Sequence, residues 1–362
     1  MEIIGVVAEF NPFHNGHKYL LDEIKKMYPD SIIILIMSGY FTQRGDVSLI
    51  SKYNKTKIAL EYGVDIVLEL PTLYTLNSAD YFASYGLYAL SELGVKKIVF
   101  GSESNDIKNL IKAAKMQVED SFNEDVKTKL KNGENYPTAL SSACGNTFES
   151  NDILAISYIK AILSNKYDIE PISIKRTNDF NETLSDEVIV SASNIRAKLK
   201  NNTDIKKYIP NYDISFINNV NEDLLFKLLY YKIITSNDLS VYLGVDEGIE
   251  NKLKKEILKS VSLDQLILNI KSKRYTYVRL KRMIMHILLG IKKCDMDEIC
   301  KSVRVLGFNK CGQKYLKDLG NNNLVFKYDN RVRELEYRAC EIYHLLTSDE
   351  SIDEEFKNKP VM

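Results

Sequence analysis

The feature that most constrains the fold is a series of short, continuous apolar segments within residues 1–100. These segments are Ile3–Ala8, Ser31–Met37, Ile66–Leu70 and Lys97–Phe100. Each has the length of a β-strand, and none shows the polar alternation of a strand with one face in water. They therefore predict strands that are buried on both faces.

Segments with helical periodicity separate these strands. The helical segments are His17–Tyr28, Ser51–Tyr62 and Ala79–Leu93. Alternation of buried strands with helices is typical of a doubly wound α/β fold, in which helices cover both faces of a parallel sheet. Ligands of such folds bind beyond the carboxyl ends of the strands, so we expect the functional residues directly after each strand.

The strand signals end well before the chain does. We expect a helix at Asn151–Leu163 and a last strand at Pro171–Lys175, followed by a loop at Asn178–Ser185. The remainder is mostly helical in pattern, with few glycines and prolines. Because 362 residues exceed one typical domain, we predict an α/β domain over residues 1–205 and an α-helical domain over residues 206–362.

The composition is that of an ordinary globular protein, with 45% apolar and 27% charged residues. No apolar run approaches the roughly 18 residues of a membrane span, and the start of the chain lacks the basic region of a signal peptide. The five cysteines form no CxxC pair, which is typical of free thiols in a reducing cytosol. We therefore expect a cytoplasmic protein with no membrane partner.

The sharpest motif is His14-Asn15-Gly16-His17, which follows the first strand and opens the first helix. Free N–H groups at a helix N-terminus favour anions, and imidazoles can donate hydrogen bonds to a phosphate that is under attack. One alternative is that one histidine caps the helix while the other packs. A zinc site is disfavoured because no third ligand is apparent.

A second motif, Ser191-Ala192-Ser193-Asn194-Ile195-Arg196, stands at the end of the α/β region. Serine hydroxyls at a helix N-terminus, with an arginine one turn along, can bind and neutralise phosphates. Taken alone, the same residues are an ordinary helix cap followed by a surface arginine.

Together these motifs resemble the HxGH signature and its ISxxxIR-type partner in the nucleotidylyltransferase superfamily. Further segments resemble, more narrowly, the bacterial tRNA(Met) cytidine acetate ligase family. They are 37–46 (MSGYFTQRGD), 100–103 (FGSE), 150–154 (SNDIL), 175–176 (KR), 273–276 (KRYT) and 303–308 (VRVLGF).

The resemblance implies a HUP/Rossmann-like, ATP-dependent enzyme with ATP, acetate and elongator tRNA(Met) as its substrates. Acetate would be activated as acetyl-adenylate, and the acetyl group would pass to the exocyclic amine of the wobble cytidine, giving N4-acetylcytidine. Mg²⁺ is expected to accompany ATP, and no metal site of the protein itself is predicted. Two alternatives stay open, a metabolite adenylyltransferase of the pantetheine-phosphate or nicotinate-mononucleotide type and a non-catalytic RNA-binding protein.

The resemblance also implies the site residues. His14 and His17 would stabilise the developing charge, while Ser193 and Arg196 would hold the leaving pyrophosphate. The ATP site would comprise Val7, Ala8, Glu9, Phe10, Asn11, Pro12, Phe13, His14, Asn15, Gly16, His17, Lys18, Tyr19 and Leu20, with Gly101, Asn151 and Arg176.

Each of the last three residues also has a plainer interpretation. Gly101 could be a simple turn glycine, Asn151 a helix N-cap, and Arg176 half of a surface ion pair. Residues 43–45 (QRG) are expected on the rim of the pocket, either beside the tRNA or the acyl group or as an ordinary loop.

A basic segment in the helical half predicts a nucleic-acid partner. Residues 271–317 contain thirteen basic and three acidic side chains in a protein of zero net charge. Such an excess, interleaved with aromatic residues, suits phosphate neutralisation and base stacking. A solvated helix face is the alternative. The predicted tRNA contacts are Lys273, Arg274, Arg279, Arg282 and Arg304.

Overall fold

A computed structural model describes residues 1–119, 147–176, 187–357 and 359–362, with isolated positions 122, 124, 126, 128, 129 and 139. Its first half alternates strands and helices. They are β1 (Ile3–Ala8), α1 (Asn15–Met27), β2 (Ile32–Ser38), α2 (Lys52–Glu61), β3 (Ile66–Leu70), α3 (Thr72–Thr75), α4 (Ala79–Glu92), β4 (Lys97–Ser102), α5 (Ile107–Val118), α8 (Ser150–Asn165), β5 (Glu170–Lys175) and α9 (Ala192–Lys200).

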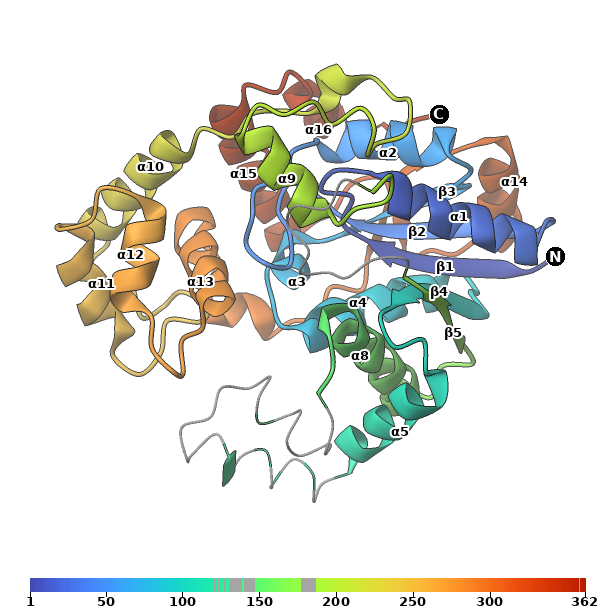
Figure 1. Cartoon of the computed structure of the whole chain (residues 1–362), viewed down its shortest axis with the longest axis horizontal. Coiled ribbons are helices and arrows are strands. Elements are labelled where there is room, and N and C mark those ends of the chain that lie inside the picture. The colour runs from blue at the N-terminus through green and yellow to red at the C-terminus, as the bar shows by residue number, and fades with distance from the viewer. Residues whose placement is uncertain are drawn as a thin grey trace.

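The second half is mainly helical. Its elements are α10 (Glu222–Thr235), α11 (Ile249–Ile257), α12 (Leu263–Ile270), α13 (Tyr277–Leu289), β6 (Val303–Phe308), α14 (Lys310–Leu319), β7 (Leu324–Val325), α15 (Asn330–Thr347) and α16 (Ile352–Lys357), with short 3₁₀ turns at Ile214–Phe216 and Lys293–Met296. Helices α10 to α13 pack on one another to one side of the sheet (Figure 1).

The sheet has the strand order β5-β4-β1-β2-β3-β6-β7. Strands β1 to β5 run parallel, and β1 is aligned with β2 so that Ala8 lies opposite Met37. All seven residues of β2 are buried. Ile34 belongs to the core cluster that includes α4 and α8, whereas Leu35 belongs to the cluster that includes α1. Alternate side chains therefore enter cores on opposite faces, and the predicted doubly wound fold is confirmed.

Two strands were missed by the sequence patterns, namely β6 and the two-residue β7. β6 lies in the predicted helical half, yet it pairs antiparallel with β3. Its partner is remote in the chain, and Arg304 interrupts an otherwise apolar run, so the local pattern gave no strand signal. The predicted domain boundary between residues 205 and 206 stays a prediction. The second half of the chain is not purely helical, because β6 and β7 extend the sheet of the first half.

Part of the predicted pattern cannot be compared with the structure. The loop expected at Asn178–Ser185 lies outside the described residues. Among the residues that the structure describes, no helix combines the length and apolar character needed to cross a membrane.

Candidate active site

A cavity of about 1020 Å³ lies beyond the carboxyl ends of the parallel strands. Its wall combines the turn after β1, the loop after β2, the starts of α4, α8 and α9, and the segment before and within α13. The predicted residues that line it are Val7, Ala8, Glu9, Phe10, Asn11, His14, Gly16, His17, Tyr19, Leu20, Gly101, Asn151, Arg176, Ser193 and Arg196. The fold thus brings the two predicted motifs to one cavity.

The two histidines are held in a defined tautomer by the backbone. His14 Nδ1 accepts a hydrogen bond from Gly16 N at 3.0 Å, and His17 Nδ1 accepts one from His14 N at 3.3 Å. The proton of each neutral ring is therefore on Nε2, where it can be donated to a ligand. The rings stack with centroids 3.8 Å apart. A Cβ on Gly16 would lie 2.9 Å from His14 Cε1, so glycine leaves room for this ring.

Both imidazoles are uncharged at neutral pH. Burial, together with the nearby charges of Arg176 and Arg196, lowers the pKa of His14 to about 3. Burial also holds the pKa of His17 well below its usual value, with contributions from His14 and Arg176. The pair therefore offers hydrogen-bond donors rather than positive charge.

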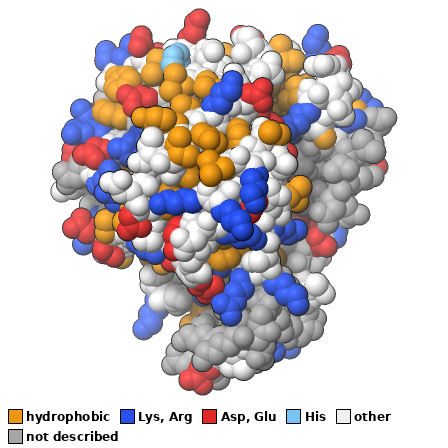
Figure 2. Space-filling model, turned by 90° about the vertical axis from the view of Figure 1, so that its left-hand side faces the viewer, with side chains coloured by type: hydrophobic (Ala, Val, Ile, Leu, Met, Phe, Trp, Pro, Cys, Tyr) orange, Lys and Arg blue, Asp and Glu red, His pale blue; other side chains and the backbone are white. Residues whose placement is uncertain are grey.

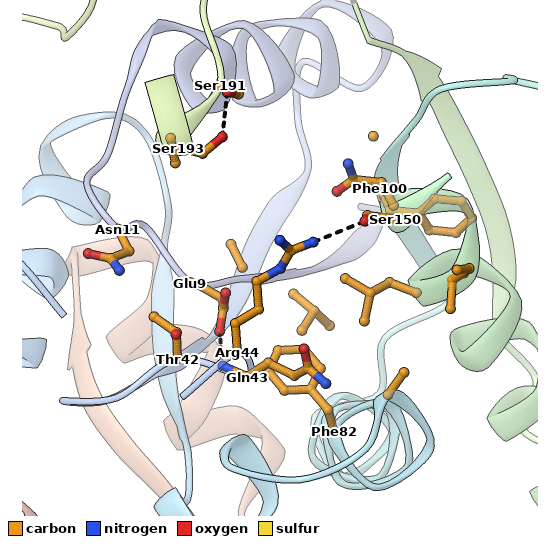
Figure 3. Close-up of a pocket in the computed structure, with 18 of the residues that line it drawn as sticks. Glu9, Asn11, Thr42, Gln43, Arg44, Phe82, Phe100, Ser150, Ser191 and Ser193 are labelled. Atoms are coloured by element: carbon orange, nitrogen blue, oxygen red, sulfur yellow. Dashed lines mark hydrogen bonds between the residues drawn. The ribbon is translucent and has the colours of Figure 1, made fainter. Parts of the chain in front are cut away.

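The serine–arginine motif lines the same cavity as the histidines. Ser191 caps α9 by accepting a hydrogen bond from Asn194 N at 3.2 Å, and its hydroxyl lies 2.8 Å from that of Ser193 (Figure 3). Arg196 Nη1 donates to the backbone oxygen of Asn11 at 2.8 Å. This bond fixes the start of α9 against the β1–α1 turn.

A third group lies at the ends of β4 and β5. Asn151 Nδ2 donates to Glu103 Oε1 at 2.5 Å, and Arg176 Nε lies 3.9 Å from the same oxygen. Arg176 Nε is buried, and among the residues that the structure describes it has no hydrogen-bond partner. A Cβ on Gly101 would lie 3.3 Å from Arg176 Cγ, so the glycine permits this close approach. Arg176 thus belongs both to an ion pair and to the cavity wall.

Four residues of the predicted ATP segment are not among those that line the cavity, namely Pro12, Phe13, Asn15 and Lys18. Phe13 is buried and stacks on His17 with centroids 5.7 Å apart. Asn15 Nδ2 donates to the backbone oxygens of Val188 and Lys207, and Lys18 pairs with Asp22. These contacts hold the turn and its helix in place.

The loop after β2 contributes more than a rim. Thr42, Gln43, Arg44 and Asp46 line the cavity, and Arg44 Nη2 donates to Ser150 Oγ at 2.9 Å (Figure 3). Gln43 N donates to Glu9 Oε1 at 2.5 Å, and burial raises the pKa of Glu9. The sequence signal for these roles was the position of the loop directly after a buried strand.

Another part of the cavity wall comes from the basic segment, residues 271–317. Arg274, Arg279 and Arg282 line the cavity, whereas Lys273 does not. Part of the positive charge is paired, because Arg274 lies 3.1 Å from Glu247 and Arg279 lies 4.0 Å from Asp246.

The predicted tRNA contact at Arg304 is wrong. Arg304 lies on β6 and is buried, with Nη1 3.2 Å from Glu69 and 2.6 Å from Glu355. A guanidinium enclosed by two carboxylates inside the protein cannot reach RNA. The sequence pattern counted this charge as a surface charge because it does not show which acids converge on it.

A doubly wound sheet with two neutral imidazoles after its first strand, and a serine–arginine cluster lining the same cavity, is the arrangement that the motifs predicted for a nucleotidyl transferase. In agreement, a family model described as HIGH Nucleotidyl Transferase matches residues 1–358. The curated proteins that match this chain over its full length have a more specific name than the family model. By this similarity, the chain belongs to the tRNA(Met) cytidine acetate ligase family.

Three relatives illustrate this similarity. The tRNA(Met) cytidine acetate ligase of Clostridium kluyveri is 34% identical and covers 100% of this chain and 99% of its own. The enzyme of Caldicellulosiruptor saccharolyticus is 35% identical, with coverage of 100% and 98%. That of Clostridium perfringens is 36% identical, with coverage of 100% of both chains.

Two solved structures share the fold. The crystal structure of Thermotoga maritima TmcAL bound with alpha-thio ATP has a TM-score of 0.84 at 27% identity, covering 97% of this chain and 96% of that one. The apo form has a TM-score of 0.82, with coverage of 99% and 92%. The chain therefore has the fold of an enzyme that binds an ATP analogue.

Proposed function

We propose that this protein uses ATP to acetylate the exocyclic amine of the wobble cytidine in elongator tRNA(Met). The names of the relatives support acetate ligation on tRNA(Met), and the alpha-thio ATP complex of T. maritima TmcAL supports ATP as co-substrate. We further propose that the protein acts in the cytoplasm. Mg²⁺ would enter with the ATP phosphates, which are its usual ligands in nucleotide-binding enzymes.

In the first step, an acetate oxygen attacks the α-phosphorus of ATP. The new oxygen–phosphorus bond forms as the bond to the β-phosphate breaks, and pyrophosphate leaves. The Nε2–H groups of His14 and His17 would donate to the oxygens that gain negative charge. Ser193 and Arg196, at the start of α9, would hold the pyrophosphate. Preorganised donors of this kind stabilise the transition state without having to reorient.

In the second step, the cytidine amine attacks the acetyl carbon and a carbon–nitrogen bond forms. The bond from that carbon to the phosphate oxygen breaks, AMP leaves with the electron pair, and the nitrogen loses one proton to the solvent. We propose that the tRNA approaches along α13, because Arg274, Arg279 and Arg282 line the same cavity. On the face that carries α10 to α13, lysine and arginine side chains gather beside an apolar area (Figure 2). Positioning of the amine against a reactive anhydride would supply most of the catalysis.

One observation carries this proposal. The HNGH and SASNIR motifs line one cavity together with Arg274, before α13, and Arg279 and Arg282, within it, although His14 and Arg282 are about 270 residues apart in the chain. A metabolite adenylyltransferase needs the first two groups but not the third. A non-catalytic RNA-binding protein needs only the third.

The test is to incubate the protein with ATP, labelled acetate and unmodified tRNA, and to analyse the nucleosides by mass spectrometry. We expect N4-acetylcytidine that requires all three substrates. The His17→Ala variant should lose acetyl-adenylate formation by about 10²- to 10³-fold and keep its tRNA affinity. ATP turnover without RNA would favour the metabolite enzyme, and tRNA binding without ATP use would favour the binding protein.

A further inference from the structure

The loop after β2 carries an arginine for which the proposed chemistry above has no role. Arg44 lies in the cavity wall, and its hydrogen bond to Ser150, at the start of α8, fixes the direction of its guanidinium. Burial lowers the pKa of Arg44 from its usual value, but the group stays charged at any physiological pH. The carboxylates of Glu9 and Asp46 lie close enough to offset part of this lowering. A half-buried guanidinium whose direction is fixed in the wall of a substrate cavity is suited to an anionic ligand.

We infer that Arg44 binds the carboxylate of the acyl substrate; this assignment rests on the proposed function. A planar guanidinium matches a carboxylate better than a lysine does, because two parallel N–H groups can meet the two oxygens. Such a contact orients one carboxylate oxygen for attack on phosphorus. Arg44 gives and takes no proton in this step.

Arg44 and the serines of the second motif lie on different parts of the cavity wall. Figure 3 shows the Arg44 guanidinium directed toward Ser150, with Ser191 and Ser193 on a separate part of the wall. A carboxylate at Arg44 and a pyrophosphate at Ser193 would therefore occupy different parts of the cavity, as the attacking and leaving groups of an in-line displacement must.

The cavity walls also suit a short acyl chain. Phe82 and Phe100 are buried, with 2% and 5% of their surfaces exposed, and they line the same cavity. Ile153 and Leu154, from the first turn of α8 beside Ser150, line it as well. Apolar walls around one guanidinium favour a carboxylate with a small apolar substituent over a hydroxylated or doubly charged acid.

The experiment is acetate-dependent exchange of label between pyrophosphate and ATP, measured with and without tRNA. We expect Arg44→Gln to raise the KM for acetate about 10- to 100-fold, the usual effect of losing hydrogen bonds to a charged group. The KM for ATP should stay within about twofold. Arg44→Lys keeps the positive charge and should raise the acetate KM by a smaller factor than Arg44→Gln. Ser150→Ala should also raise the acetate KM, because the guanidinium is no longer oriented, but by a smaller factor because the guanidinium is still present.

Arg333→Gln is the matched control, since Arg333 lies on α15 and is not among the cavity-lining residues. Bound ATP and an unchanged melting temperature establish that each variant is folded. An equal rise in both KM values, or an unchanged acetate KM with weakened tRNA binding, would overturn the assignment of Arg44. A wild-type protein without acetate-dependent exchange in either arm would instead overturn the proposed function, and the assignment with it.

Discussion

His14 and His17 each use Nδ1 to accept a backbone N–H, which leaves Nε2–H as the donor toward the cavity. A glutamine amide can present an N–H near the position of Nε2, but alanine cannot. We therefore predict that His17→Gln retains at least about tenfold more adenylation activity than His17→Ala, measured by pyrophosphate exchange. Equal activity of the two variants would contradict a role as a neutral donor.

The pH dependence of the same reaction provides an independent prediction. Because burial lowers the pKa of His14 to about 3 and holds that of His17 well below its usual value, both rings are uncharged at neutral pH. Catalysis by imidazolium would fall as pH rises through 6.5, the usual pKa of histidine. We expect no such fall in kcat/KM between pH 5.5 and 7.5, with saturating ATP and the exchange assay as readout.

At the same scale, the sequence identifies residues better than it identifies their surroundings. The HNGH and SASNIR motifs could be placed at helix N-termini because local sequence sets where a helix begins, and the structure brings both to one cavity. The role of Arg44 could not, since it depends on Ser150 from a distant helix. Arg304 was misassigned for the same reason, because Glu69 and Glu355 come from separate elements.

Among the elements, the loop after β2 is clamped to α13. Lys281 forms an ion pair with Asp46, and Arg282 Nη1 donates to the backbone oxygen of Gln43 at 3.4 Å. Gly45, with φ +80°, lies where a Cβ would be 2.9 Å from Arg282 N. The loop therefore connects the proposed tRNA-binding helix with the cavity wall at Arg44.

Gly45→Ala should disturb this contact. It introduces a strained backbone and a clash with α13, so we expect the free energy of unfolding to fall by about 1–3 kcal/mol more than in a matched glycine variant. Gly248→Ala is that control, because Gly248 also has φ +80° but would place its Cβ in open space. Urea denaturation measures the free energy of unfolding of both variants. Equal losses would mean that close packing against α13 contributes nothing.

Strands and helices of the first half were predictable because each is defined by a local pattern. In the sequence, β1 to β4 are apolar runs, and α1 and α4 are amphipathic or apolar segments between these runs. β6 was not predictable in this way, since its pairing with β3 is decided by an element far away in the chain. Local periodicity carries no information on such a partner.

At the scale of the whole molecule, a buried ion cluster joins both halves of the chain. Lys52 of α2 lies 2.7 Å from Glu355 of α16 and 3.5 Å from Glu336 of α15, and it also pairs with Glu69 of β3. Burial and the neighbouring Glu69 raise the pKa of Glu336 to about 8, so this carboxyl keeps its proton in the folded state at neutral pH.

The cluster predicts how stability depends on pH. Between about pH 4.5 and 8 the folded protein holds a proton on Glu336 that the unfolded chain has lost, so the free energy of unfolding falls as pH rises, by about 1.4 kcal/mol per pH unit. Glu336→Gln removes this contribution. Urea denaturation at pH 5.5, 6.5 and 7.5 should therefore give a steeper decline for the wild type than for the variant. Parallel curves would contradict a protonated Glu336.

The antiparallel pairing of β3 with β6 has a consequence for the synthesis of the chain. The ribosome makes Leu70 about 230 residues before Val303, so nascent β3 emerges with one hydrogen-bonding edge vacant. Apolar strands in that condition readily recruit edges from other polypeptides. During translation, β3 is thus prone to intermolecular association until β6 has been synthesised and pairs with it.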